Sequence, residues 1–426
     1  MSQHDCVINN GTGTAVLADM NAALKALASC QSGAVAPTTT YPGMFWLDTS
    51  IPPDGFLRQR NRANTAWVQV LGLPPKATED VAAAGTDTAS YLTAKMLGEQ
   101  QGAWLNFARN RLVNPAFQIS QENASNAGGN GWYAADQWLC AYTQPSLVAS
   151  YQRVKVGTRY KLRVTVTTAG ATPVGAEYFA ILQRIEGTRI ADFRFGTAQA
   201  SKVIVRLGFR GPAGTYGVAL RNGARCYANQ LVITAAQANL DQIRTFEIPG
   251  DIAGTWGITE ANSIELWITF AAGPTYQAAP NVWTAGAQLA PTGMTNGAAS
   301  TANIFEIYDV GLYLDVTGTG QPPPFKEPDE AKELLTCQRY YVMEYTIFCQ
   351  NTGLANTWYG VTTLPVDLRI ATPTMTQEAN SGNSTTFPTT STYAFVAPRT
   401  MRVARLSTAG GTAQLFHEFT NVSARM

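Results

Sequence analysis

The sequence is poor in charged residues and in residues with metal-binding or nucleophilic chemistry. Asp, Glu, Lys and Arg make up 14% of its 426 residues, and the formal net charge is +1. No block of like charges occurs, which argues against nucleic acid or an anionic membrane as a partner. There are only two histidines, His4 and His417, and the six cysteines include no CxxC pair. We therefore expect no metal, no cofactor and no catalytic histidine.

Targeting and catalytic motifs are also missing. No apolar run approaches the roughly 18 residues that span a bilayer, and the polar start of the chain does not resemble a secretory signal. Glycine-rich nucleotide loops and the G-x-S-x-G nucleophile motif do not occur. We expect a soluble protein, not an enzyme, that is made in a cytoplasm. That compartment disfavours a Cys337–Cys349 bridge, although the sequence leaves the question open.

The length predicts two to four domains, of which the first covers residues 1–75. Helical spacing predicts a helix over 14–30, with an apolar face formed by Leu17, Met20, Leu24 and Leu27. After Pro and Gly turns, short strands are expected at 44–47, 55–60 and 66–70. Such a small helix plus β-meander module buries little surface, so we expect neighbouring chains to complete it.

Residues 76–110 are predicted to form a helical linker. Its spacing of Leu92, Met96, Glu99 and Ala103 suits either a seam between parallel chains or ordinary packing. Over 111–325, short alternating strands separated by Gly, Pro and Asn predict an antiparallel β-sandwich of jelly-roll type. After a Pro-rich breaker and a helical turn, a smaller β unit is expected over 326–426. The predicted fold class is therefore mainly β.

Several segments resemble modules of tailed-bacteriophage proteins. The opening of the sandwich resembles a phage β-sandwich pattern, N-x-L-x-N-G-x-F and then Y-x-A-D-R-W, with matches at Asn114, Phe117, Tyr133, Asp136 and Trp138. It departs from the pattern at Pro115 and Gln137, where Gly and Arg are usual. The segment ELLTCQRYY, from Glu333 to Tyr341, is similar to a later landmark of that module. The N-terminal part, with SGAVAPTTTYPGMFWLDTS, is similar to a virion-proximal module of tail-fibre-like proteins.

The resemblance implies a virion fibre or spike subunit, made in the host bacterial cytoplasm and attached to the particle by residues 1–75. The candidate attachment residues are Tyr41, Phe45, Trp46, Arg58, Arg60 and Trp67. We expect other virion proteins as partners and a homotrimer as the assembly. A head-decorating or collar fibre and a polysaccharide-degrading tailspike are the alternatives, and the position on the particle is left open.

Aromatic residues beside turns are the candidate ligand site for a host-surface glycan, because rings stack on sugars. These residues are Trp132, Tyr133, Trp256, Tyr276 and Trp283. If their three loops cluster, they form an uncharged platform whose binding changes little with salt. We then expect Trp256→Ala and Trp283→Ala to leave folding intact and to reduce adsorption. The alternative is that each ring plugs one end of the sandwich.

Other residues of the resemblance are assigned structural roles. Asp136 and Trp138 belong to the opening of the module and are expected to support the fold more than a ligand. Arg339 and the pair Tyr340–Tyr341 are expected to pack between the two β units. The expected charge partner of Arg339 is Glu333 or Asp329.

Overall fold

The structure, a computed structural model, divides the chain into two compact units, Met1–Gln100 and Gln101–Met426. It describes residues 3–50, 55–71, 109–316, 318–351, 357–369, 373–381, 392–397, 400–406 and 416–426. The linker expected over 76–110 falls almost entirely outside these residues. Its helix and its seam between chains therefore stay predictions.

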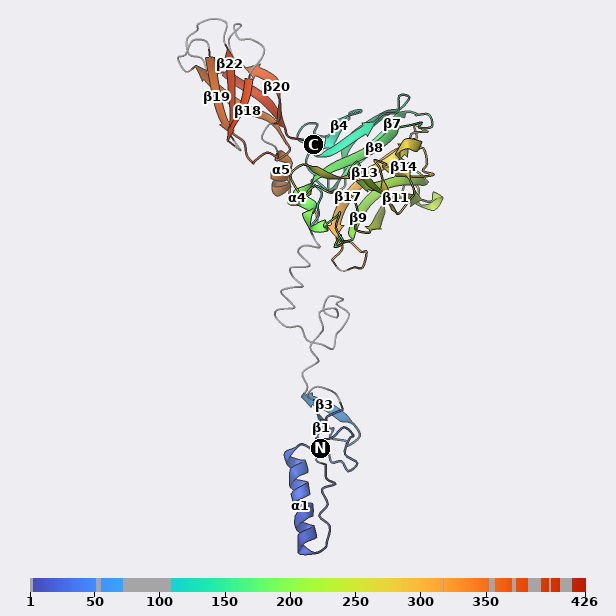
Figure 1. Cartoon of the computed structure of the whole chain (residues 1–426), viewed down its shortest axis with the longest axis vertical. Coiled ribbons are helices and arrows are strands. Elements are labelled where there is room, and N and C mark those ends of the chain that lie inside the picture. The colour runs from blue at the N-terminus through green and yellow to red at the C-terminus, as the bar shows by residue number, and fades with distance from the viewer. Residues whose placement is uncertain are drawn as a thin grey trace. The chain divides into compact units, whose positions relative to one another are not determined.

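The N-terminal unit consists of helix α1 (Gly13–Ala28) and a three-stranded antiparallel sheet (Figure 1). The strands follow in the order β1 (Phe45–Asp48), β2 (Phe56–Arg60) and β3 (Trp67–Leu71). The Thr12 hydroxyl caps the helix by accepting a hydrogen bond from the amide of Ala15, at 3.4 Å. The predicted helix and strands are confirmed.

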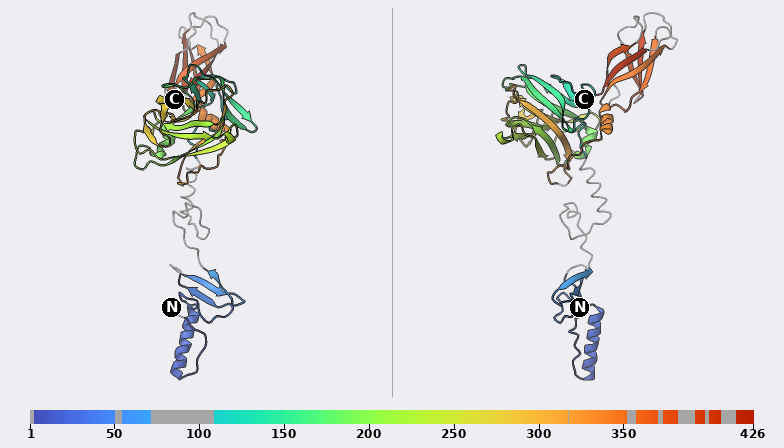
Figure 2. Two further views of the ribbon diagram at one scale, coloured as in Figure 1. Left: turned by 90° about the vertical axis from the view of Figure 1, so that its right-hand side faces the viewer. Right: turned by 180° about the vertical axis from the view of Figure 1, so that it is seen from behind.

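Helix α1 does not use its leucine face for packing inside the unit. Leu17, Met20, Leu24 and Leu27 are exposed by 57%, 48%, 61% and 73%, whereas Ala26 is buried. Figures 1 and 2 show the extended segment 3–12 running beside the helix. This contact uses a neighbouring stripe, where Asp19 accepts a hydrogen bond from the Asn9 amide at 2.8 Å. The apolar face that the spacing predicts exists, but it points to solvent.

The second unit contains a β-sandwich of two antiparallel sheets (Figure 1). The seven-stranded sheet has the order β15 (Trp283–Ala285), β11 (Arg225–Ile233), β10 (Gly214–Arg221), β13 (Asn262–Ala272), β8 (Tyr178–Glu186), β5 (Trp138–Tyr142), β4 (Trp132–Ala135). The five-stranded sheet has the order β12 (Gln242–Ile248), β9 (Val203–Arg210), β17 (Ile304–Leu314), β7 (Arg159–Thr168), β6 (Val148–Val156). Most successive strands cross from one sheet to the other, as in a jelly roll.

Alternation along the strands places apolar side chains between the two sheets. In β7, Leu162, Val164 and Val166 are buried in the core, and the residues between them lie on the other face. Phe270 of β13 stacks on Phe305 of β17 with ring centroids 4.4 Å apart, which joins the sheets at the centre of the core. Full burial of each such side chain is worth about 1.5–3 kcal/mol. The predicted β-sandwich is confirmed.

Short elements complete the sandwich, and a smaller sheet follows it. The short elements are α4 (Gly187–Ile190), the 3₁₀ turns Ala191–Phe193, Ala235–Gln237 and Pro274–Tyr276, and the parallel pair β14 (Gln277–Ala278) and β16 (Ala290–Pro291). Helix α5 (Glu330–Gln338), capped by Asp329, leads to the C-terminal sheet. Its order is β20 (Thr374–Ser381), β23 (Phe416–Ser423), β18 (Tyr341–Asn351), β19 (Thr357–Thr363), β22 (Thr400–Leu406), β21 (Thr392–Ala397).

Candidate functional site

The outer face of the five-stranded sheet carries a group of charged side chains around Glu306 of β17. Because Phe305 and Ile307 point into the core, Glu306 and Tyr308 lie on the opposite face. Strand β7 places Lys161 and Arg163 on this same face. The sequence of each strand therefore turns an apolar side toward the sandwich core and a charged side outward.

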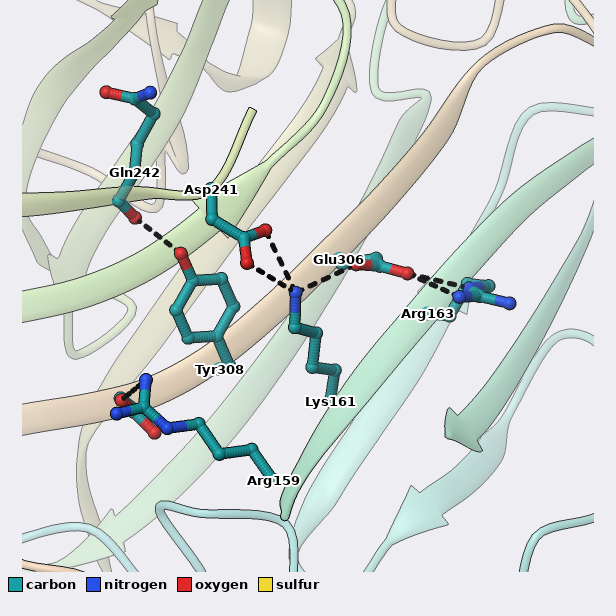
Figure 3. A network of polar contacts seen from close by, with 8 residues as sticks. Arg159, Lys161, Arg163, Asp241, Gln242, Glu306 and Tyr308 are labelled. Carbon is teal, nitrogen blue, oxygen red and sulfur yellow. Dashed lines mark hydrogen bonds and ion pairs between the residues drawn. The ribbon is translucent and has the colours of Figure 1, made fainter. Parts of the chain in front are cut away.

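Glu306 is held by two cations from the neighbouring strand (Figure 3). Its Oε1 accepts hydrogen bonds from Nε and Nη2 of Arg163, at 2.9 and 2.6 Å. Its Oε2 accepts one from the Lys161 ammonium at 3.1 Å, and the same ammonium lies 2.9 Å from Oδ1 of Asp241. Lys161 and Glu306 are buried, so these contacts satisfy charges that burial would otherwise destabilise.

Tyr308 contacts Lys161 and fixes its own ring through a hydrogen bond. The Lys161 ammonium lies 4.6 Å from the centroid of the Tyr308 ring, and the Tyr308 hydroxyl donates a hydrogen bond to the Gln242 carbonyl at 3.1 Å. The ring crosses strand β9 at Gly208, where a Cβ atom would lie 2.4 Å from the ring. Any larger residue at position 208 would therefore displace the Tyr308 ring.

A cavity of about 530 Å³ opens beside this network, and we call it the sheet-face pocket. Its lining combines apolar and polar side chains: Val156, Arg163, Arg210, Asn239, Ala302, Ile304 and Glu306. Val156 and Ile304 are exposed by 45% and 43%. The volume falls within the range of small-molecule sites, and the mixed lining suits a ligand with both apolar and hydrogen-bonding surface.

The electrostatics of Glu306 keep it ionised. Burial raises the pKa of this carboxyl, but the hydrogen bonds and charges of Arg163 and Lys161 outweigh burial and lower the pKa below its ordinary 4.5. The Asp309 carboxyl, paired with Arg159 at 3.0 Å, behaves oppositely, because burial raises its pKa more than nearby arginines lower it. A carboxylate with a lowered pKa does not suit general acid catalysis at neutral pH.

The structure does not bring the three predicted aromatic loops together. Trp132 and Tyr133 belong to β4 at one edge of the seven-stranded sheet, and Trp283 belongs to β15 at the opposite edge. Tyr276 packs elsewhere, against Tyr178 with ring centroids 5.8 Å apart. The expected platform of three clustered loops is therefore not formed, because the strand order places the loop of Trp132 and Tyr133 at the opposite edge of the sheet from Trp283.

Trp256 and Trp283 meet at one end of the sandwich core. Their ring centroids are 5.6 Å apart, and both rings pack on Phe195, at 5.1 and 5.7 Å. Trp256 is only 8% exposed, and its indole N–H donates to the Ala253 carbonyl at 3.2 Å. This ring has little free face to offer a sugar, so its position matches the alternative in which it plugs the sandwich.

Tyr133 is covered by an arginine from the C-terminal end of the chain. The Arg425 guanidinium lies 3.8 Å from the Tyr133 ring centroid and 4.0 Å from that of Tyr341. Trp132 packs over Gly128, where a Cβ atom would lie 2.0 Å from the indole ring. Both aromatic residues thus contribute to packing within the second unit.

Residues at the start of the sandwich form one buried corner around Asn114. Asn114 has a positive φ of 52°, and its side-chain amide donates to the carbonyls of Ile119 and Asp136, at 2.7 and 3.2 Å. Its carbonyl accepts from the Trp138 indole at 3.0 Å. Trp138 is fully buried and packs on Phe117, with centroids 5.0 Å apart. These contacts give Asn114 and the rings of Phe117 and Trp138 structural roles in the second unit.

The segment around Arg339 contacts the sandwich, but not through either charge partner predicted from the sequence. Arg339 pairs with Glu186, at 3.3 Å between Nε and Oε1. Glu333 instead accepts a hydrogen bond from the Asn114 amide, and Asp329 caps α5, so the expected pairing with either acid is wrong. Cys337 is a free thiol packed in a small apolar cluster and forms no bridge.

Five of the six candidate attachment residues lie on the sheet of the N-terminal unit, and Tyr41 lies in the segment before β1. The Trp46 and Trp67 rings are 5.4 Å apart, and Arg58 and Arg60 lie over them at 5.8 and 5.5 Å. This set of four packs within the unit. Tyr41 and Phe45 are exposed by 47% and 41%, so they are the members of the set that present a surface to a partner.

Comparisons with known proteins give only slight likenesses. No family model matches the chain, and no curated protein matches it. Among solved structures, the enzymatically active domain of tailspike protein 4 of bacteriophage CBA120 is 8% identical, with a TM-score of 0.25 over 54% of this chain. This chain spans 23% of that tailspike chain.

Carbohydrate-binding modules are also among the similar structures. One is a CBM4 structure that is 13% identical to this chain, with a TM-score of 0.24, and the match covers 47% of this chain and 98% of that one. Another is the family 11 module of a Clostridium thermocellum cellulosomal cellulase, with 11% identity and a TM-score of 0.23, and the match covers 45% of this chain and 96% of that one. Scores this low carry no argument about what the chain does. None of the helices in the described ranges is long and apolar enough to cross a membrane.

Proposed function

We propose that this chain is a bacteriophage fibre or spike subunit whose β-sandwich binds a carbohydrate on the host surface. The observation that carries the binding role is the sheet-face pocket, where Val156 and Ile304 lie beside Arg163, Asn239 and Glu306. Sugars present C–H surfaces and hydroxyl groups together, and this lining offers apolar contacts, donors and acceptors for both. The phage assignment is supported by the sequence pattern whose residues build the Asn114 corner.

The pocket favours binding over hydrolysis. Glycoside hydrolysis requires one carboxyl that can donate a proton and a second that acts as base or nucleophile. Glu306 is the pocket's acidic residue, and its hydrogen bonds to Arg163 and Lys161 hold it ionised. A polysaccharide-degrading spike remains the rival, and halo formation by the purified protein on a host lawn is the result that would favour it.

Competition for adsorption tests the binding role. Excess purified protein should block phage adsorption, whereas Val156→Asp protein should block it much less, because the new charge replaces an apolar wall of the pocket. Val148→Asp is the matched control, since Val148 starts strand β6, Val156 ends it, and the two are exposed by 48% and 45%. If the unmodified protein leaves adsorption unchanged, the head-decorating or collar role with no receptor is the better assignment.

We also propose that residues 1–75 attach the protein to the virion, with Tyr41 and Phe45 at the contact. Phage whose chain lacks these residues should assemble without the protein, as judged by immunoblots of purified particles. Normal incorporation of the truncated chain would contradict the anchoring role. Electron microscopy of labelled particles would then show whether the protein sits at the head, the collar or the tail.

We further propose a homotrimer, because α1 presents a seam that its own chain leaves open. Leu17, Met20, Leu24 and Leu27 follow the 3-4-3 spacing of a coiled coil, and all four are exposed. The positions beside this seam carry no charge that would repel an identical helix: Val16, Asn21, Ala23 and Ala28. Burying the four side chains between copies would remove apolar surface that a monomer leaves in water.

Light scattering with Leu24→Asp tests this assembly. The unmodified chain should have a mass three times the 45.8 kDa of one chain, and Leu24→Asp should lower it. Leu240→Asp is the matched control, because Leu240 is 54% exposed and belongs to the other unit. A single-chain mass for the unmodified protein at micromolar concentration would contradict the proposal.

A further inference from the structure

We infer that the sheet-face pocket takes a carbohydrate that carries a carboxylate, such as a uronic acid residue. This inference rests on the proposed carbohydrate-binding function and adds the chemical class of the ligand. It starts from the charges that line the pocket, which are concentrated there in a chain otherwise poor in charge.

The first observation is the position of Arg210 on strand β9. It stands in register with Glu306 on β17, which is in turn in register with Arg163 on β7, so three side chains on adjacent strands form one row across the sheet. Arg210 is exposed and lines the pocket. Within the described part of the chain it has no ion-pair partner. Its guanidinium is therefore available to an anion from outside.

Arg163 supplies a second guanidinium edge. Its Nε and Nη2 are committed to Glu306, but its Nη1 makes no hydrogen bond to any residue that the structure describes. The side chain is 39% exposed, and it lines the same cavity. Because Glu306 fixes one edge of this guanidinium, the other edge is held in place before a ligand arrives, which lowers the entropy cost of binding.

The charge balance of the site also favours an anion. Three cations, Lys161, Arg163 and Arg210, face two carboxylates, Asp241 and Glu306, and the two carboxylates already bind Lys161 and Arg163. One positive charge is left, and it lies at the pocket. A carboxylate between two guanidinium groups accepts several charge-assisted hydrogen bonds at once, which a neutral hydroxyl cannot do.

The distance between the strands suits this arrangement. Neighbouring strands are about 4.8 Å apart, so the backbones at Arg163 and Arg210 are about 10 Å apart, and Glu306 lies between them. Two long side chains can reach a common group above Glu306. The apolar walls at Val156 and Ile304 would then contact the C–H surface of the sugar ring that carries the acid.

Calorimetry with the full chain tests the inference. The probes are hexamers of glucuronate and of galacturonate, and the same hexamers with their carboxyl groups reduced to alcohols. We expect at least one acidic hexamer to bind about tenfold more tightly than its reduced form. Raising NaCl from about 50 to about 500 mM should remove much of that difference, because the exposed charge of Arg210 is screened.

Arg210→Gln should lower the affinity for the acidic hexamer about tenfold and leave the affinity for the reduced hexamer unchanged. Arg194→Gln is the matched control, because Arg194 is also exposed, lies in the same unit and does not line the pocket. If acidic and reduced hexamers bind equally and Val156→Asp abolishes both, the inference is overturned while the proposed function stands. If neither form binds, the inference is again overturned, and the adsorption assay decides the function separately.

Discussion

Replacing Trp256 tests whether this tryptophan binds a ligand or belongs to the core of the sandwich. From the sequence, Trp256→Ala is predicted to leave folding intact, but in the structure the ring is only 8% exposed and contacts Phe195 and Trp283. Truncation of a buried Trp or Phe to Ala typically costs about 3–5 kcal/mol. We therefore expect Trp256→Ala to lower the free energy of unfolding by about 4 kcal/mol, a large part of the roughly 5–15 kcal/mol of a whole domain.

Trp256→Phe serves as the conservative variant. It keeps a ring against Phe195 but loses the hydrogen bond to the Ala253 carbonyl, which should cost about 1–2 kcal/mol. Urea unfolding followed by circular dichroism measures both variants, and comparable slopes make the midpoints comparable. A Trp256→Ala midpoint equal to that of the unmodified chain, together with impaired carbohydrate binding, would refute this reasoning and restore the loop site.

Three further predictions concern other buried groups. Glu306→Gln should lower the free energy of unfolding at pH 7 by about 2 kcal/mol. Because the folded-state pKa of Glu306 lies below 4.5, the difference between variant and unmodified chain should shrink as the pH falls through that pKa. Urea titrations from pH 7 to pH 3 measure this difference. Asn114→Ala should cost about 3 kcal/mol, and Asn114→Gly about 1 kcal/mol less because glycine tolerates the positive φ; equal costs would contradict the backbone part of this account. Burial raises the pKa of the Cys337 thiol, so Cys337 should react with an alkylating reagent only after unfolding. Cys6 is exposed and should react in the native chain. Peptide mapping by mass spectrometry measures both reactions.

Much of the fold is predictable because each strand carries its own alternating pattern. In β7, Leu162, Val164 and Val166 alternate with polar residues, so both the strand and its buried face can be read locally. The structural role expected for Asp136 and Trp138 can also be predicted from the sequence, and both residues are buried, as that role requires. Local patterns suffice where the packing partner is simply the nearest apolar layer.

Helix α1 shows where the same reasoning stops. Its spacing identifies the apolar face correctly, but not what that face contacts. The helix packs on its own unit through alanines and Asp19, and the leucines stay outside. Periodicity alone cannot distinguish a core from an interface, because burial against the same chain and against another chain requires the same residues.

The sheet-face pocket could not be predicted, for a different reason. Arg163 and Glu306 are 143 residues apart, and only the pairing of β7 with β17 brings them together. A signal did exist in the run of Arg159, Lys161 and Arg163, which puts three cations on one face of a strand in a chain with few charges. Its acidic partner lies on a strand that no short-range pattern connects to it.

A site on a sheet face has different consequences from one on loops. Arg163 and Glu306 are fixed by strand pairing and by each other, so the pocket is largely formed before a ligand binds and loses little entropy on binding. In the proposed function, a small open pocket of this kind would bind a single sugar weakly, and the affinity would then depend on the number of copies that bind together. The proposed seam on α1 would supply those copies by joining chains, and its residues belong to a different unit from the residues that line the pocket. The proposed assembly and the proposed recognition therefore depend on different residues of the chain.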